Sequence, residues 1–147
     1  MRQRNEHGLS ESDRVAIVHA ISEAERGSSG EVRVHLEERC PGEDALARAK
    51  EVFAALGMHG TKNATGVLLY LATKDRRAAV YAAEGLYEAT EPSVWQGVVA
   101  RAAEGYKSGK PGEGLVAALG LVGEVLRTHA PGHDEHGDEL PNELSEA

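Results

Sequence analysis

A chain of 147 residues has the usual length of a single domain, and 41% hydrophobic with 27% charged residues is an ordinary globular balance. The formal net charge of −8 is concentrated near the C-terminus, where six acids and no Lys or Arg lie between His129 and Ala147. The rest of the chain is nearly neutral, which argues against nucleic acid or anionic lipid as a partner.

The single cysteine, Cys40, excludes an intrachain disulfide, and a thiol beside Pro41 is most simply read as inert. The polar N-terminus has no apolar stretch of signal-peptide length. No segment approaches the roughly 20 apolar residues that cross a bilayer. We therefore expect a cytoplasmic protein without direct membrane insertion.

The first predicted elements are a helix and a strand. Ser10 suits the capping position of a helix whose apolar residues recur at helical spacing until Gly27. Residues 31–37 then alternate, which predicts a strand with one buried face and one solvated face. We expect His35 to be exposed, because it lies on the polar face with Glu31, Arg33 and Glu37.

The middle and end of the chain predict two more strands and three more helices. An amphipathic stretch over residues 45–56 predicts the second helix. The uninterrupted apolar run 66–72 is typical of a central strand, and a tight turn leads to a third strand over 77–81. Pro92 suits the first turn of a third helix, and leucines and a valine at helical spacing mark a fourth over 115–126.

The order α-β-α-β-β-α-α predicts an α/β fold: a three-layer α/β/α sandwich around a small mixed sheet. The first two strands should be parallel and joined by a right-handed crossover. We expect one domain over residues 1–130, followed by an acidic tail over 131–147. That tail is either disordered or anchored through Leu140 and Leu144.

Four segments resemble the TPM domain family, in particular its short, stand-alone bacterial members. They are residues 29–37 (Ser-Gly-Glu-Val-Arg-Val-His-Leu-Glu), 53–58, 66–71 and, displaced in register, 142–144. The resemblance covers most of the chain and implies an α/β/α sandwich. It also implies functions described for relatives: binding of calcium or other divalent ions, acid phosphatase activity in a plant member, and accessory roles in membrane complexes.

One group of oxygen-bearing side chains is a candidate metal site. An antiparallel third strand would end, near Glu84 and Glu88, beside the entry to the second strand at Asn63. Hard cations prefer oxygen ligands, so Glu84, Glu88 and Asn63 could bind calcium or another divalent ion weakly. Short relatives usually carry Gly-Asp before a Gly where this chain has Ala-Ala-Glu-Gly at 82–85, which leaves Glu84 as the substitute. The alternative is a solvated acidic loop.

Two other patterns have simpler explanations. Five acids lie at the opposite rim: Glu37, Glu38, Glu43, Asp44 and Asp75. Glu43 and Asp44 begin the second helix, where the helix dipole accounts for acidic residues. His129, His133 and His136 could chelate a transition metal. Pro131 and Gly132 break any helix between them, so a weakly chelating tail is the simpler interpretation.

The sequence contains no Gly-x-Ser-x-Gly elbow and no Walker loop. We therefore expect a non-catalytic TPM-type binding module with no catalytic residues. It would bind a divalent cation weakly, an unidentified protein partner, or both, and no other cofactor. The alternative is an enzyme, a metal-assisted hydrolase of the acid-phosphatase type.

Overall fold

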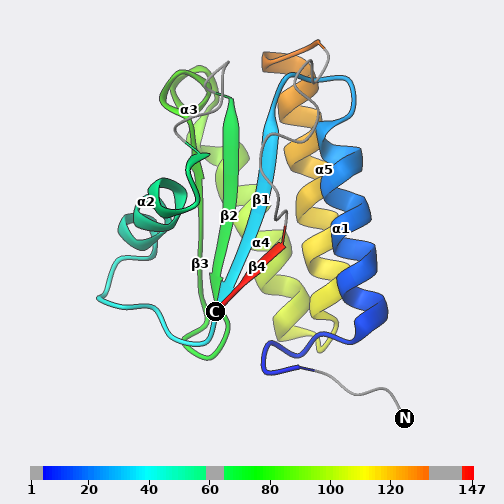
Figure 1. Ribbon diagram of the computed structural model, residues 1–147, viewed down its shortest axis with the longest axis vertical. Coiled ribbons are helices and arrows are strands. Elements are labelled where there is room, and N and C mark those ends of the chain that lie inside the picture. Colours follow the sequence, from blue (N-terminus) through cyan, green and yellow to red (C-terminus); the bar gives the residue numbers. More distant parts are fainter. Residues whose placement is uncertain (1–4, 59–64, 133–143) are drawn as a thin grey trace.

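The structure is a computed structural model that describes residues 5–58, 65–132 and 144–147 (Figure 1). Its elements are, in chain order, α1 (Glu11–Glu25), β1 (Glu31–Glu37), α2 (Ala45–Ala55), β2 (Gly66–Ala72), β3 (Arg77–Ala82), α3 (Glu84–Ala89), α4 (Pro92–Lys107), α5 (Pro111–His129) and β4 (Leu144–Glu146). Helices lie on both sides of one small mixed sheet, so the predicted α/β sandwich is confirmed.

The sheet has the strand order β3-β2-β1-β4. β1 pairs in parallel with β2, from Glu31 opposite Gly66 to Glu37 opposite Ala72, and in parallel with β4. β3 returns antiparallel to β2. β1, β2 and β4 therefore end at one edge, which we call the C-terminal edge. The opposite edge, where β1 and β2 begin and β3 ends, is the N-terminal edge.

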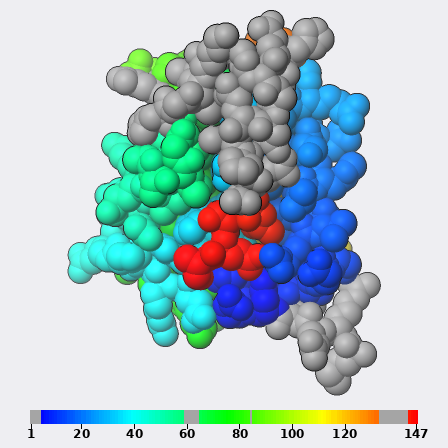
Figure 2. Space-filling view, viewed as in Figure 1, coloured from blue at the N-terminus to red at the C-terminus, as the bar shows by residue number. Residues whose placement is uncertain are grey.

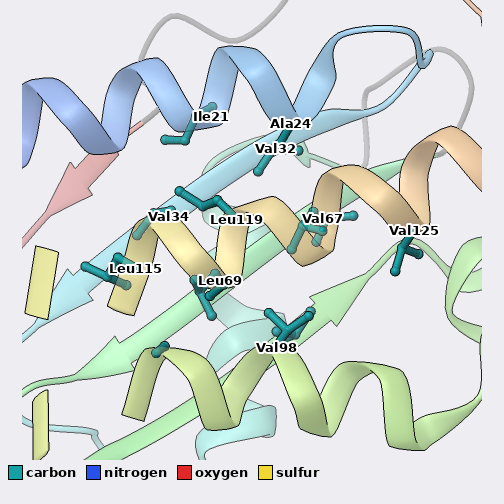
Figure 3. Close-up of a cluster of buried hydrophobic side chains, with 14 of the residues drawn as sticks. Ile21, Ala24, Val32, Val34, Val67, Leu69, Val98, Leu115, Leu119 and Val125 are labelled. Carbon is teal, nitrogen blue, oxygen red and sulfur yellow. The ribbon is translucent and has the colours of Figure 1, made fainter. Parts of the chain in front are cut away.

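One face of the sheet is covered by α1, α4 and α5. The apolar side chains of β1 and β2, such as Val34 and Leu69, pack there against Leu115, Leu119 and Val98, all fully buried (Figure 3). The strict alternation of β1 directs its apolar set to this face. Each such side chain contributes about 1.5–3 kcal/mol on full burial, so this layer is the main core.

The other face carries α2, which lies on the far side of the sheet from α1 and α5 (Figure 1). Phe53 of α2 packs with Leu68 and Tyr70 of β2, which is why the 66–72 run is apolar at every position. The apolar cluster on this face includes residues of β2 and β3 but none of β1. The polar side chains of β1 lie on this same face.

The helix starts follow local chemistry. Ser10 and Asp13 form a reciprocal capping box at α1: Ser10 Oγ accepts from Asp13 N at 3.1 Å, and Asp13 Oδ2 accepts from Ser10 N at 2.9 Å. Asp44 caps α2, and Pro92 and Pro111 occupy the first turns of α4 and α5. Among the described residues, no helix combines the length and apolarity of a membrane span.

The structure adds two short elements to those expected, α3 and β4. β4 pairs with β1 through Leu144, Ser145 and Glu146, and Leu144 packs against the main core. Leu140 lies outside the described residues. A strand of three residues has too little alternation to be recognised from sequence.

Candidate functional site

Two residues of the sequence-predicted metal site, Glu84 and Glu88, belong to α3, which begins at the N-terminal edge of the sheet. Ala83 N donates to Gly66 O at 2.8 Å, so the start of α3 lies beside the start of β2, as the expected topology requires. Glu84 is the first residue of α3, and Glu88 follows one turn later with an exposed side chain. Asn63 lies outside the described residues. The structure thus brings the backbone of Glu84 to the predicted place.

The polar face of β1 is not solvated, so that part of the strand prediction is wrong. Glu31, Arg33, His35 and Glu37 are only 3%, 3%, 7% and 6% exposed, and the expected exposure of His35 is wrong with it. At the C-terminal half of the stripe the physical reason is that His35 and Glu37 have partners from three other elements: Tyr70 of β2, Arg48 of α2 and Ser145 of β4.

Glu37 is the centre of this buried cluster. Its two carboxylate oxygens accept from Arg48 Nε and Nη2, each at 2.9 Å, and Tyr70 OH donates to one of the same oxygens. Burial alone would raise the pKa of Glu37, but the hydrogen bonds from Arg48 and Tyr70 outweigh it and hold that pKa below its usual range. Burial and the bond to this carboxylate raise the pKa of Tyr70.

His35 lies between this carboxylate and the C-terminal strand. Its Nδ1 is 2.9 Å from Ser145 Oγ, its Nε2 is 3.6 Å from Glu37 Oε1, and its ring stacks on Tyr70 with 13° between the planes. Burial lowers the pKa of His35, and the nearby carboxylate only partly opposes this. The ring is therefore neutral at neutral pH.

The chemistry of this cluster is structural. The carboxylate of Glu37 is engaged by a bidentate guanidinium and a phenol, which is a strong and geometrically specific arrangement. Tyr70, with its raised pKa, is a poor nucleophile. These groups hold β1, β2 and α2 together.

Sequence reasoning missed Arg48, although one signal was present. Arg48 follows Ala45 by three residues and precedes Val52 by four, so it belongs to the apolar side of α2. A basic residue at such a position requires a buried acidic partner. The partner is Glu37 of β1, the strand that contributes no side chain to the apolar cluster beneath α2.

The buried His35 predicts a loss of stability in mild acid. In the unfolded chain a histidine takes up a proton near pH 6.5, whereas the folded state resists that proton because the pKa of His35 is lowered. The unfolded state then binds more protons, so the stability present above pH 6.5 is lost as the pH falls below it.

The measurement is urea unfolding at pH 7.5, 6.5 and 5.5. We expect His35→Gln to flatten the decrease in unfolding free energy over this range. The matched control His19→Gln, whose side chain is 74% exposed, should leave the decrease unchanged. An unaltered decrease in the His35 variant would show that another group causes it.

Most of the acids at the C-terminal edge have structural partners, but none lies in the first turn of α2, which begins at Ala45. Asp44 is the cap of α2 and accepts from Leu46 N and Ala47 N. Asp75 accepts from Arg39 Nη1 at 2.9 Å and from Cys40 N at 2.7 Å, and these two hydrogen bonds lower its pKa. Cys40 itself is buried.

The fold defined by these elements is an α/β sandwich with helices on both faces of a mixed sheet. The TPM domain model matches residues 3–125, so the chain belongs to the TPM domain family, and the resemblance seen in the sequence is confirmed. None of the curated proteins compared with the chain matches it.

Three solved structures are similar. The NMR structure of the BA42 protein from the psychrophilic bacterium Bizionia argentinensis is 34% identical with a TM-score of 0.83, and the match covers 98% of this chain and 99% of that one. An N-terminal domain from P. gingivalis (22% identity, TM-score 0.68, 87% and 84% covered) shares the fold. So does one from Corynebacterium glutamicum (14%, 0.63, 91% and 85%).

Proposed function

We propose that the chain is a small cytoplasmic TPM-type binding module, without catalytic activity, that binds a divalent cation at the N-terminal edge of its sheet. Calcium is the first candidate ion, and a protein partner is a second ligand of the same module. The ligands would be Glu84, Glu88 and Asn63, with backbone carbonyls and water completing the six to eight oxygens that calcium takes.

The observation that carries this proposal is the fixed backbone at that edge. Ala83 N bonds to Gly66 O at 2.8 Å, and Thr65 Oγ1 donates to Ser29 O at 2.9 Å, so three chain segments are held together where the ligands are expected. Chain segments that are already held together place ligands at low entropic cost. This supports the N-terminal edge as the place where an ion binds.

The non-catalytic character is supported by how the ionisable groups are used. Glu37 and Asp75 have lowered pKa values because of structural partners, Arg48 with Tyr70 in one case and Arg39 with Cys40 N in the other. Perturbed groups at active sites would instead face a cleft.

The alternative hydrolase is less well supported by the shape of the molecule. A groove of about 900 Å³ runs along β3 and α4, where Arg76, Arg77 and Lys107 could attract phosphate. Among the described residues that line it, Glu43 is the one acid. Metal-assisted phosphoryl transfer requires several oxygen ligands beside the bound phosphate, and the proposed ion site lies at the other end of β3.

The proposal predicts weak calcium binding at the N-terminal edge. In a calcium titration followed by amide NMR, shifts should appear at residues 65–66 and 83–88. Glu84→Gln with Glu88→Gln should weaken binding by at least about tenfold, because each removes a charged oxygen ligand. Amide substitutions of Asp134, Glu135, Asp138 and Glu139 in the tail should leave binding intact.

The matched control is Glu104→Gln with Glu124→Gln, which removes the same charge from exposed positions on α4 and α5. Shifts that are confined to the tail, or that the control removes equally, would contradict a built site. Calcium-dependent hydrolysis of a phosphomonoester that is lost in Glu84→Gln would favour the hydrolase.

A further inference from the structure

The C-terminal edge brings together both ends of the described chain. Residues 5–9 fold back on themselves: Asn5 N donates to Leu9 O at 2.8 Å, and Asn5 Oδ1 accepts from His7 N at 2.9 Å and Leu9 N at 3.1 Å. Asn5 Nδ2 in turn donates to Glu146 Oε2 at 2.8 Å. Figure 2 shows this N-terminal segment, in dark blue, directly beside the red C-terminal strand.

Three side chains with metal-ligating atoms meet at this contact: Glu6, His7 and Glu146. One ligand atom from each lies within 4.8 Å of the others. His7 Nε2 is 3.8 Å from Glu6 Oε1. The side chain of His7 is fully buried, whereas that of Glu6 is 51% exposed, so solvent reaches the group at Glu6.

His7 Nδ1 has an oxygen partner on the side of the ring away from Glu6. It lies 3.0 Å from Thr73 Oγ1, which is itself 3.4 Å from Glu37 O. When the ring proton is on Nδ1 and points at Thr73 Oγ1, the lone pair of Nε2 is available to a cation. A metal-ligating histidine usually donates its other ring N–H to an oxygen in this way.

His7 Nε2 is also unsatisfied within the described chain. It is buried and has no hydrogen-bond partner there, although buried polar atoms rarely lack one. A buried lone pair beside two carboxylates is explained if a cation belongs between them.

The carboxylate of Glu146 is held ready by its neighbours. Oε2 accepts from Asn5 Nδ2 and Oε1 accepts from Arg14 Nη2, both at 2.8 Å. Each carboxylate oxygen has a second lone pair that these bonds leave available. Two carboxylates against the one guanidinium of Arg14 give the group a net negative charge.

We propose that Glu6, His7 and Glu146 form a transition-metal site for an ion of the zinc class. One imidazole nitrogen and two carboxylate oxygens are accepted zinc ligands, and a water molecule would complete four-coordination. Calcium, which takes oxygen ligands, is not the ion that this donor set selects. The site lies at the opposite edge of the sheet from the proposed calcium site and does not depend on it.

Such an ion would join the N-terminal segment to β4. Because it binds the folded state, where the two chain ends meet, zinc should raise the melting temperature, and above the dissociation constant the rise should follow the logarithm of the zinc concentration. The site therefore links metal availability to docking of both ends of the chain onto the C-terminal edge.

The test uses the full chain carrying His133→Asn and His136→Asn, which removes the tail histidines that could chelate zinc by themselves. Zinc should shift the ring-nitrogen resonances of His7 and raise the melting temperature. His7→Asn should abolish both effects. Glu6→Gln, an exposed position that keeps the fold, should weaken zinc binding by about tenfold or more.

Glu11→Gln is the matched control, since its side chain is 83% exposed and lies outside the group. It should leave zinc affinity unchanged, and millimolar calcium should leave the His7 ring resonances in place. Zinc binding that survives both His7→Asn and Glu6→Gln would overturn the proposal. So would a His7 ring whose two nitrogens both carry protons at neutral pH and do not respond to zinc.

Discussion

Gly114→Ala should destabilise the protein by about 3 kcal/mol, an effect at the upper end of what overpacking usually costs. α4 and α5 make their closest approach where Gly105 faces Gly114. A Cβ on Gly114 would lie 2.5 Å from the Cα of Gly105 and 2.9 Å from Arg101 O. Both contacts are with backbone, so the helices would have to separate, and the core layer that they form over the sheet would loosen.

Gly120→Ala in the same helix should instead stabilise the protein. Gly120 is exposed and a Cβ there meets nothing within 4 Å, so alanine gains up to about 1 kcal/mol of helix propensity. Chemical denaturation of the two variants measures both effects. Equal shifts of the same sign would mean that the helix approach does not limit packing.

Arg48→Met should cost about 3 kcal/mol at pH 7, because it leaves the buried carboxylate of Glu37 without its guanidinium. The side chain of Glu37 is 8% exposed, so solvent cannot replace the lost partner, although Tyr70 still donates one bond. Adding Glu37→Gln should recover part of the loss, since a neutral amide needs no counter-ion.

Arg39→Met is the matched control. Arg39 is 72% exposed and pairs with Asp75 at the surface, so its removal should cost less than about 1 kcal/mol. Urea unfolding at pH 7 and pH 4 supplies a second check, because protonation of Glu37 in acid should reduce the deficit of the Arg48 variant. A deficit that is the same at both pH values would point to lost packing by the arginine stem.

The part of the candidate site that follows from topology could be predicted. An antiparallel hairpin of β2 and β3 must return the chain to the start of β2, and the backbone of Glu84 lies there. Burial of the β1 polar face could not be predicted. The alternation of apolar and polar residues predicts which side chains share a face of a strand, but it does not predict which other elements cover that face.

The contacts that hold the C-terminal edge together are the hardest to predict from the sequence. His35 meets Ser145, and Asn5 meets Glu146, across more than a hundred residues. β4 offers only three residues to recognise. Such pairs carry no periodic signal of their own.

The sequence by itself determined the features that depend on neighbouring residues. These are the capping box of α1, the apolar faces of the helices, the crossover between β1 and β2 and the family to which the chain belongs. Only the tertiary structure decided that Glu37 pairs with Arg48 inside the protein and that His7 meets Glu146. The physical reason is that propensity and periodicity act over one or two turns of chain, whereas a buried charge or a metal ligand is defined by whichever distant segment packs against it.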